Sequence, residues 1–352
     1  MATIYEIAKE AKVSPSTVAR ALRGTGYCSP ENRERIQAIA KRMGYVPSHA
    51  ARSLKSKRTQ KVLFCIPDIY NPFYFRMIKG ASDVLEDHGY FPVLCHTKGD
   101  LKTELKMLRN LQEGYGDGMI FVSFDFNERN IAAVNASGCP VVLTNNYQSP
   151  DGRDNFDCVY VDTHEGIRMA AVHFINKGYQ RIGYLGGNTQ TQTGKERFSG
   201  FMRALQEKGV PIHQRYFKVG DFSTESGRQA MLELIESGDL PDALVVANDL
   251  MAIGALKVCQ EHGVKVPEDM AVIGMDDSDL AFHLNLSSIH MYEEEIGKQA
   301  ARLLMDRILR VNQDKKTIRL QPSLVLRYTS EGPETAGDST VLADSLQPDI
   351  AP

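Results

Sequence analysis

The stretch 13–24, VSPSTVARALRG, places side chains suited to reading DNA on one side of an expected helix. Ser16, Arg20 and Arg23 fall on one stripe at helical spacing, and apolar residues fall on another. The guanidinium of Arg20 has the reach and the donor fork to bind both acceptors on the major-groove edge of a guanine. Ser16 is shorter and reads its base more weakly. We therefore expect the polar stripe to face DNA, with the solvated face of an ordinary amphipathic helix as the alternative.

A second set of polar residues lies in the rest of the chain. Asn145, Asn248 and Asp276 each stand at the end of an apolar run, and Arg197 lies in TGKERFSGF. Carboxylates and amides accept hydrogen bonds from hydroxyls, whereas a guanidinium donates in a fixed fork. Each residue alone is typical of a turn or a helix cap. Their recurrence at expected strand ends indicates a binding site for a hydroxyl-rich ligand.

Three helix starts position the first set within the first sixty residues. Thr3 and Glu6 fit a capping box, and a serine N-cap precedes proline at positions 14–15 and 29–30. The link between the first two helices, residues 12–14, is as short as the connection of a helix-turn-helix. In that motif the second helix lies in the major groove of DNA. A helix hairpin with a charged, solvated face is the alternative.

The charge of the chain is divided unevenly. Residues 1–60 hold 12 Lys and Arg against 4 Asp and Glu, and the remainder holds 29 against 40, within a net charge of −3. A small basic segment on a large acidic body is typical of a polyanion-binding module joined to a separate functional domain.

The remainder of the chain alternates short apolar runs with amphipathic stretches. Seven runs are rich in Val, Ile and Leu without polar alternation: residues 62–67, 90–96, 118–123, 140–145, 181–187, 243–248 and 270–276. Such runs are typical of parallel strands buried on both faces, so we expect a doubly wound α/β architecture. Because seven strands exceed one sheet of ordinary size, we expect two lobes, with ligands bound at the carboxyl ends of the strands.

The stretch TIYEIAKEAKVSPSTVARALRG, followed by GYVPSHAARSLKS, resembles the DNA-binding end of the lactose repressor (LacI/GalR) family. The resemblance is strongest to the purine repressor branch and extends to about residue 330. It implies a three-helix DNA-binding domain followed by a two-lobed effector domain of the periplasmic-binding-protein type. Three positions depart from the family pattern: Lys12 replaces the usual glycine of the turn, Ala19 replaces a serine, and Ser48 replaces the asparagine after the hinge proline.

The pattern and the resemblance together divide the chain into four segments. We expect a helix-turn-helix domain over 1–47, a hinge over 48–60, an effector-binding and dimerisation domain over 61–330, and a disordered acidic tail over 331–352. The two lobes are expected at about 61–160 with 291–320, and at about 161–290 with 321–330. The tail carries five acids and no Lys or Arg after Thr329, which favours disorder.

The resemblance implies that the hinge becomes helical on operator DNA and inserts Leu54 into the minor groove as an apolar wedge. A basic flexible linker is the alternative. The residues expected to contact DNA are Thr3, Ser14, Pro15, Ser16, Thr17, Arg20, Arg23, Arg52 and Leu54. We expect a homodimer on a near-palindromic operator of double-stranded DNA, because two-fold proteins read two-fold sites. The resemblance leaves a tetramer open, although a tail without leucine heptads favours the dimer.

The resemblance also aligns residues with the effector pocket of the family. The expected effector contacts are Phe73, Tyr74, Asn145, Arg197, Phe222, Asn248 and Asp276. The chain has no tryptophan, so stacking on a ligand ring must use Phe or Tyr. A sugar or sugar derivative is the expected effector, and a purine or nucleoside acting as corepressor is the alternative.

Other classes of function find little support in the sequence. The chain contains none of GxGxxG after a strand, GxxxxGK[ST], GxSxG or HExxH, so we expect no enzyme, no catalytic residue and no cofactor. The six cysteines lack metal-ligand spacing, so we expect reduced thiols and no metal. Residues 1–13 resemble no secretory leader and no run is long enough to span a membrane, so we expect a cytoplasmic protein. A secreted sugar-binding protein of the same fold is less favoured.

Overall fold

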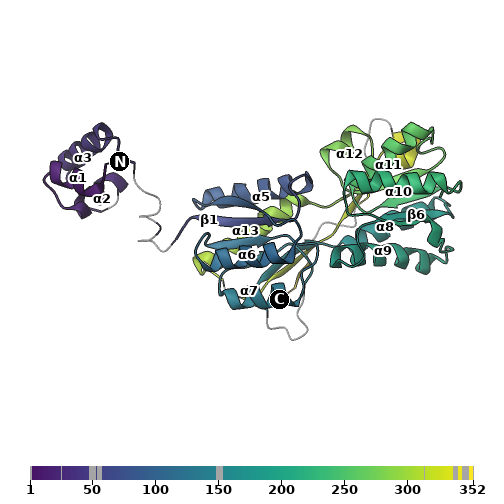
Figure 1. Cartoon of the computed structure of the whole chain (residues 1–352), viewed down its shortest axis with the longest axis horizontal. Helices are drawn as coiled ribbons and strands as arrows, with labels where there is room; N and C mark the ends of the chain where they lie inside the picture. Colours follow the sequence, from purple (N-terminus) through teal and green to yellow (C-terminus); the bar gives the residue numbers. More distant parts are fainter. Residues whose placement is uncertain are drawn as a thin grey trace. The chain divides into compact units, whose positions relative to one another are not determined.

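The computed structural model describes residues 2–24, 26–46, 53, 58–147, 154–312, 314–335, 340–342 and 349–351. The chain forms two compact units, Met1–Thr59 and Gln60–Pro352, drawn in Figure 1. The first unit is called the head and the second the body. The expected hinge residues Arg52 and Leu54 lie outside the described residues.

The head consists of three helices around a small apolar core. They are α1 (Ile4–Glu10), α2 (Pro15–Arg23) and α3 (Pro30–Arg42). The predicted caps are confirmed: Thr3 and Glu6 form a capping box, and the side chains of Ser14 and Ser29 each accept a hydrogen bond from the backbone of the following helix. Ile7, Val18 and Ile36 are fully buried where the helices meet. Packing of α1 and α2 in this core therefore holds both ends of the turn that joins them.

The body contains two seven-stranded sheets, one in each lobe. The first sheet has the order β14-β11-β5-β4-β3-β1-β2 and the second has the order β13-β12-β10-β9-β8-β6-β7. The strands of the first sheet are β1 (Lys61–Ile66), β2 (Phe91–His96), β3 (Gly118–Phe121), β4 (Val141–Leu143), β5 (Asp157–Val161), β11 (Thr317–Leu320) and β14 (Asp349–Ala351). Those of the second are β6 (Ile182–Gly186), β7 (Phe217–Val219), β8 (Ala243–Val246), β9 (Ala271–Asp276), β10 (Ser287–His290), β12 (Ser323–Leu326) and β13 (Thr340–Leu342).

Most strand pairs are parallel, and the antiparallel pairs lie at or next to one edge of each sheet. β14 pairs antiparallel with β11, β12 with β10, and β13 with β12. Between the described strands the chain passes from one lobe to the other four times, after β5, after β10, after β11 and after β13. The expected doubly wound α/β class with two lobes is confirmed, and each of the seven predicted runs overlaps a strand.

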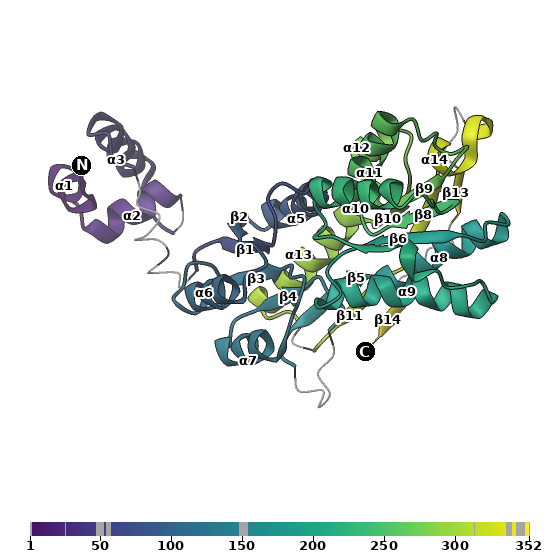
Figure 2. The ribbon, with the colours of Figure 1, turned by 45° about the vertical axis from the view of Figure 1, so that its right-hand side comes forward.

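Helices cover both faces of each sheet. The first lobe has α5 (Phe73–Asp87), α6 (Leu101–Gln112), α7 (Glu128–Ser137) and α13 (Glu293–Leu309), with α5 packed on α13 and α6 on α7. The second has α8 (Thr163–Asn176), α9 (Gln192–Lys208), α10 (Thr224–Glu236), α11 (Asp249–His262), α12 (Asp279–His283) and α14 (Tyr328–Glu331), with the 3-10 turns Gln214–Tyr216 and Gly332–Thr335. Figure 2 shows α10 and α11 on one side of the second sheet and α8 and α9 on the other.

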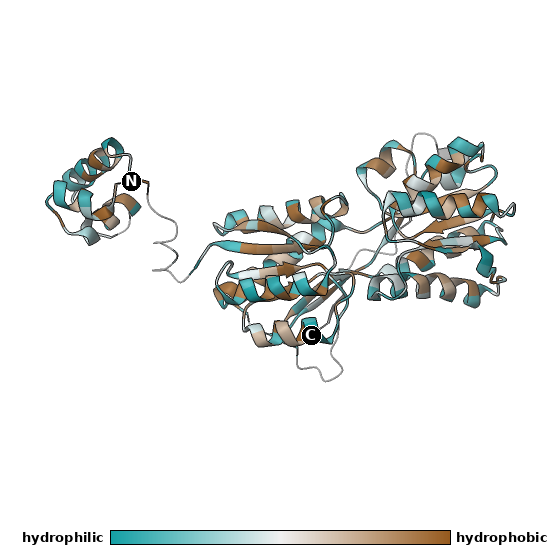
Figure 3. Cartoon of the chain, in the orientation of Figure 1, coloured by the Kyte–Doolittle hydropathy of each residue, from teal (hydrophilic) through white to brown (hydrophobic). Residues whose placement is uncertain are grey.

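The strands provide the core that both layers of helices cover. Figure 3 shows apolar colour concentrated on the strands and on the inner sides of the helices. Two glycines bring α5 and α13 into backbone contact: a Cβ at Gly80 would lie 2.0 Å from the Glu294 carbonyl oxygen, and one at Gly297 would lie 1.9 Å from that of Met77. This contact fixes the start of α13 beside the junction of the lobes.

The tail differs from the sequence prediction. Disorder is expected over 331–352, whereas the structure places β13 and β14 within that range, each at the edge of a sheet. The edge strand of a sheet exposes a row of unpaired backbone donors and acceptors. A further antiparallel strand can pair with them through its backbone, which does not require a long apolar run in its sequence. Composition therefore understates the order of these segments.

Two further observations concern the cysteines and the possibility of a membrane-spanning helix. All six cysteines are unpaired, and Cys65, Cys158 and Cys259 are buried. No helix in the described part of the chain is long and apolar enough to cross a membrane.

Candidate functional site

The first turn of α2 carries a cluster of hydroxyl groups. Ser14 Oγ lies 2.8 Å from Ser16 Oγ and 2.9 Å from Thr17 Oγ1. Ser14 also caps the helix by accepting a hydrogen bond from the Thr17 backbone N–H. Ser14 and Ser16 are exposed, whereas Val18 and Ala21 on the opposite side of the helix are buried. The helix therefore presents hydroxyls and its positive N-terminal end on one open face.

Arg20 lies over this turn and is exposed. Its Nε donates to the Ser16 carbonyl at 3.4 Å, and its Nη2 donates to Thr17 Oγ1 at 3.4 Å. Both bonds are long and solvent-exposed, so a better acceptor readily replaces them. Arg23 is also exposed on this helix, whereas the Thr3 hydroxyl is engaged with Glu6 in the capping box of α1. The stripe predicted from the sequence is thus exposed as expected, with Thr3 held in a structural role.

A cavity lies between the two lobes of the body, and both lobes supply its walls. Its volume is about 570 Å³, counting its open mouth. It is lined by Phe73, Tyr74, Met77, Val122, Ser123, Phe124, Thr144, Asn145, Asn146, Tyr160, Val161, Thr163, Thr193, Glu196, Arg197, Met291 and Ile296. The structure therefore brings together four of the seven predicted effector residues: Phe73, Tyr74, Asn145 and Arg197.

Arg197 supplies the positive charge of this cavity. Its side chain is 8% exposed; Nη1 donates to the Ala247 carbonyl oxygen, and the guanidinium lies 5.2 Å from the centre of the Phe222 ring. Its Nε is buried and has no partner among the described residues. A buried donor without a partner is costly, and a ligand oxygen in the cavity removes that cost.

The other three predicted residues stand behind the cavity wall. Phe222 stacks on Phe124, a lining residue, with 5.4 Å between ring centres. Asn248 caps α11: its Oδ1 accepts from the Met251 N–H at 3.0 Å and its Nδ2 donates to the Phe222 carbonyl at 2.9 Å. Phe222 has a φ of 71°, a value that L-residues rarely adopt, and the Asn248 amide fixes its carbonyl there.

Asp276, at the end of β9, is buried and has a φ of 123°. Burial raises the pKa of its carboxyl well above the ordinary value, and the nearby charge of Asp249 raises it further, whereas Arg197 lowers it. Burial also raises the pKa of Asp249 to about 6, although Asp249 accepts hydrogen bonds from Ser278 and Ser288 at 2.7–2.8 Å. Two carboxyls thus share a buried region next to the Arg197 guanidinium.

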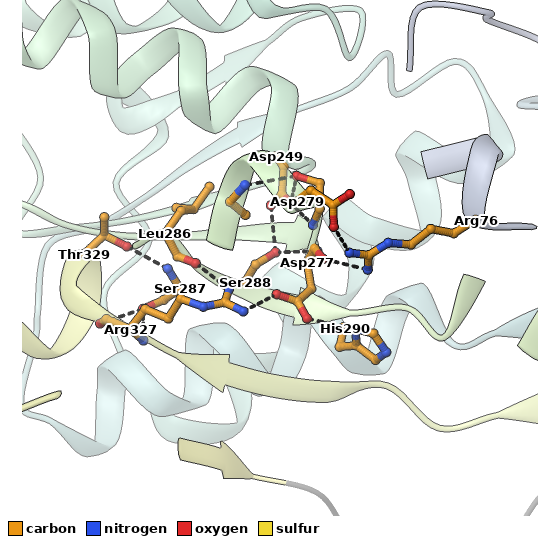
Figure 4. A network of polar contacts seen from close by, with 12 residues as sticks. Arg76, Asp249, Asp277, Asp279, Leu286, Ser287, Ser288, His290, Arg327 and Thr329 are labelled. Atoms are coloured by element: carbon orange, nitrogen blue, oxygen red, sulfur yellow. Dashed lines mark hydrogen bonds and ion pairs between the residues drawn. The ribbon is translucent and has the colours of Figure 1, made fainter. Parts of the chain in front are cut away.

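A polar network around Asp277 holds the adjoining loop (Figure 4). Arg327 Nη2 lies 2.6 Å from Asp277 Oδ1, and His290 Nδ1 lies 2.9 Å from Oδ2. Burial alone raises the pKa of Asp277, but the hydrogen bond from His290 and the charge of Arg327 bring it below the ordinary value. Arg76 of α5 donates to the Asp277 carbonyl at 3.1 Å and pairs with Asp279. The network therefore also links the two lobes.

Several lining residues were not predicted. Thr193 and Glu196 lie within one helical turn of Arg197 on α9, a spacing that the sequence shows. Tyr160 lies in β5, a strand that the apolar runs did not reveal. Thr144 Oγ1 is buried without a partner among the described residues, and Thr144 lines the cavity.

These features define a class of protein: a DNA-binding transcriptional regulator whose helix-turn-helix head is joined to a two-lobed domain with a ligand cavity. Comparison with known proteins agrees. A model described as "Bacterial regulatory proteins, lacI family" matches residues 3–48, and one described as "Periplasmic binding protein-like domain" matches residues 171–330.

Full-length relatives extend this agreement. The HTH-type transcriptional repressor PurR of Photobacterium profundum is 32% identical over 93% of this chain and 98% of its own. Catabolite control protein A of Priestia megaterium is 30% identical over 94% and 99%. The chain therefore belongs to the lacI family of bacterial regulatory proteins.

Solved structures share the fold. A transcriptional regulator CelR–cellobiose complex is 29% identical, with a TM-score of 0.70, and covers 94% of this chain and 100% of its own. The lac repressor dimer bound to operator and an anti-inducer is 22% identical, with a TM-score of 0.82 over 94% and 99%. At that identity the likeness concerns the fold alone.

Proposed function

We propose that the protein is a repressor that binds a palindromic operator as a homodimer and changes its affinity for DNA when a small molecule occupies the interlobe cavity. The observation that carries the proposal is that Arg197 of one lobe and Phe73 and Asn145 of the other line the same cavity. A ligand that contacts both lobes favours one of their arrangements over another. A protein that acts on operator DNA works in the cytoplasm, and we place it there.

In this proposal α2 lies in the major groove. Arg20 reads a guanine edge and Ser16 contacts a neighbouring base, while Ser14, Thr17 and Arg23 contact phosphates. Pro15 starts the helix and leaves its amino end open to the backbone of the DNA. Thr3 contributes by capping α1. The hinge residues Arg52 and Leu54 are proposed to enter the minor groove, with Leu54 as the wedge.

We propose a sugar or sugar derivative as the effector. Hydroxyl and amide groups of Ser123, Thr144, Asn145 and Thr193 line the cavity beside Arg197, and such groups bind hydroxyl-rich ligands. Phe222, Asn248 and Asp276 are proposed to take part from behind the wall or when the lobes close further. A purine is the second candidate, because the rings of Phe73 and Phe124 in the cavity can also stack on a planar base.

An exposed apolar face supports the homodimer. On α5 and the loop before it, Tyr70 is 83% exposed and Phe75 53%; on and beside α12, Leu280, Phe282 and Leu284 are 48–60% exposed. The Arg76–Asp279 ion pair holds these two elements next to each other. Clusters of large exposed apolar side chains mark interaction sites. We call this set the α5–α12 face and propose that a second copy covers it.

The test of the proposed function is selection of operator DNA from a random pool, followed by titration of the selected site with variants. We expect Arg20→Ala to lose discrimination at one base position in each half-site, at a cost of about 1–3 kcal/mol, while a salt-dependent affinity remains. Lys41→Ala, which removes an exposed charge from α3, is the control and should keep the preference at every position. An Arg20→Ala protein with the full wild-type sequence preference would overturn the assignment.

A further inference from the structure

Two cysteines face each other across the neighbouring parallel strands β1 and β2. The register of this pair of strands places the Cα atoms of Cys65 and Cys95 opposite one another. Neighbouring strands lie about 4.8 Å apart, which is within the range of about 4.4–6.8 Å that separates the Cα atoms of a disulfide. The backbone therefore already holds the two residues at the separation that a disulfide bond needs.

Both side chains lie on the same face of the sheet. Phe64 belongs to the core on one face, whereas Cys65 belongs to the apolar cluster on the other face, to which α6 and α7 contribute. Cys95 packs against that second cluster. Facing residues on one side of a sheet have neighbouring side chains, so the two thiols meet. The Cys65 S–H donates a hydrogen bond to the sulfur of Cys95.

The two thiols differ in their access to solvent. Cys65 is fully buried. Cys95 is only partly buried, because β2 is the strand at one edge of its sheet. A small oxidant in solution therefore reaches Cys95 first, and it reaches Cys65 only through the sulfur of Cys95.

The acidity of the two thiols differs in the same sense. The hydrogen bond from Cys65 lowers the pKa of the Cys95 thiol, although burial raises it in part. The same hydrogen bond, burial and the nearby carboxyl of Glu104 raise the pKa of the Cys65 thiol well above its ordinary value. The thiolate is the nucleophilic form of cysteine, and its fraction increases as the pKa falls. Cys95 is thus the more reactive thiol, and Cys65 stays protonated beside it.

The other cysteines of the body, all of which the structure describes, lack this combination. Burial raises the pKa of Cys139, and it raises those of Cys158 and Cys259 to about 12. Cys158 faces Leu143 and Thr317 on its neighbouring strands, and the other two cysteines lie outside the strands. A solvent-accessible thiol of lowered pKa beside a second cysteine is the arrangement typical of redox-responsive pairs.

We propose that Cys65 and Cys95 form a redox-responsive pair, which a small hydroperoxide converts into a disulfide between β1 and β2. The Cys95 thiolate attacks the terminal oxygen of the hydroperoxide, and the O–O bond breaks. The leaving oxygen takes up the proton that Cys95 had released and departs as an alcohol, or as water if the oxidant is hydrogen peroxide. Cys95 becomes a sulfenic acid.

Cys65 completes the reaction. Its sulfur attacks the sulfur of Cys95, the S–O bond breaks, and the hydroxyl group leaves as water with the proton of Cys65. The two thiols together lose two electrons and two protons, and the hydroperoxide is reduced. A thiol reductant reverses the product by thiol–disulfide exchange.

This pair is separate from the residues of the proposed function. Neither cysteine is among the described residues that line the interlobe cavity, and neither lies in the head. Oxidation of the pair requires neither operator nor effector, so its test has an outcome independent of the proposed function.

The test is treatment of the reduced full chain with a small excess of hydrogen peroxide, followed by alkylation of the remaining thiols and mass spectrometry of the peptides. We expect a linked pair of peptides, Cys65 with Cys95, lighter by two hydrogens than the separate peptides and released by dithiothreitol. We expect the pair to lose its thiols about tenfold or more faster than Cys139 does.

Three results would overturn the proposal. Cys65 and Cys95 would both remain open to alkylation while Cys139 is oxidised. Alternatively, peroxide would carry Cys95 to a sulfinic acid without linking it to Cys65. A disulfide from either cysteine to any other thiol would also contradict the pairing.

Serine variants separate the roles of the two thiols. Cys65→Ser should leave Cys95 as a sulfenic acid that dimedone traps, because the second thiol is missing. Cys95→Ser should leave the buried Cys65 unoxidised. Cys139→Ser is the control, since Cys139 is partly buried like Cys95 but has no facing cysteine, and it should form the linked peptides at the wild-type rate. Oxidation of Cys65 at the wild-type rate in Cys95→Ser would overturn the assignment of Cys95 as the reacting thiol.

Discussion

Arg197 joins the wall of the interlobe cavity to the core behind it. The guanidinium faces Phe222, Nη1 is held by the Ala247 carbonyl, and Nε has no partner among the described residues. Two of its interactions therefore hold it in place, and the buried Nε remains as a donor for a ligand.

Residues near Arg197 show that a predicted contact can have a structural role. Asn248 uses its oxygen to cap α11 and one amide hydrogen to hold the Phe222 carbonyl. Asp276 is buried beside Asp249 rather than in the cavity lining. Both stand at the carboxyl end of a strand, as predicted, but strand position alone does not tell a lining side chain from one that supports the lining.

Glu293, the first residue of α13, makes stability depend on pH. It is 2% exposed, and burial raises the pKa of its carboxyl to about 7, although His290 and Arg76 lower it in part. In the unfolded chain this carboxyl loses its proton near 4.5. Between these values the folded state holds more protons, so the free energy of unfolding falls as pH rises from about 4.5 to about 7.

We predict that Glu293→Gln raises the free energy of unfolding above pH 7 by up to about 3 kcal/mol and reduces its decline across this window. Asp249, with a pKa of about 6, leaves a residual slope. Thermal unfolding at a series of pH values measures the effect. Glu294→Gln is the control, because hydrogen bonds from Lys298 and Lys79 lower the pKa of the Glu294 carboxyl, which therefore titrates below this pH window. The same pH slope in Glu293→Gln as in wild type would refute the role of Glu293.

At the scale of the elements, a strand with buried polar residues is hard to recognise from the local sequence pattern. The seven apolar runs each overlap a strand, but β10 has the sequence SSIH and was not predicted. Ser287 and Ser288 are fully buried there, since Ser287 bonds Arg327 and Thr329 and Ser288 bonds Asp249. Those partners are distant in the sequence, so no local pattern shows that the hydroxyls are satisfied.

From the local sequence pattern, strand-end residues of the candidate site were likewise predicted only where the strand itself was predicted. Residues directly after predicted strands, such as Asn145, were found from the sequence, and Tyr160 was missed because β5 was missed. β5 starts with Asp157, which is buried and paired with Arg307 at 2.8 Å. The burial of a charged residue at the end of a strand can be understood only once its ion-pair partner, which is distant in the sequence, is known.

The turn of the helix-turn-helix contains a strained residue. Lys12 has a φ of 53°, in the left-handed region that glycine adopts without cost. We predict that Lys12→Gly raises the free energy of unfolding of the head by about 0.5–1 kcal/mol. Glycine removes the cost of the left-handed backbone at this position, and its greater conformational freedom in the unfolded chain offsets part of that gain.

Hydrogen exchange of the α1 and α2 amides in the full chain measures this change, since the head has its own core. Lys9→Gly, within α1, is the matched control and should instead lower stability by about 1 kcal/mol. Faster exchange in Lys12→Gly than in wild type would show that the turn is not strained at this position.

At the scale of the whole molecule, the α5–α12 face is the surface proposed to join two copies. We predict that Phe75→Asp converts the dimer to a monomer, because a carboxylate at the centre of an apolar interface loses its hydration on association. Sedimentation velocity measures the mass. Ile212→Asp is the control, since Ile212 is 41% exposed in the loop after α9, away from this face. A dimeric Phe75→Asp protein would place the interface elsewhere.

The central claim is that occupancy of the interlobe cavity controls the affinity for operator DNA. The direct measurement is titration of the selected operator with wild-type and Arg197→Ala proteins, without ligand and at saturation with whichever of a set of sugars and purines binds the wild type most tightly in calorimetry. We predict that the ligand changes the operator affinity of the wild type by about 5- to 150-fold, and that Arg197→Ala binds the operator normally without ligand but no longer responds. Unchanged operator affinity of the saturated wild type, or a wild-type response from Arg197→Ala, would contradict the claim.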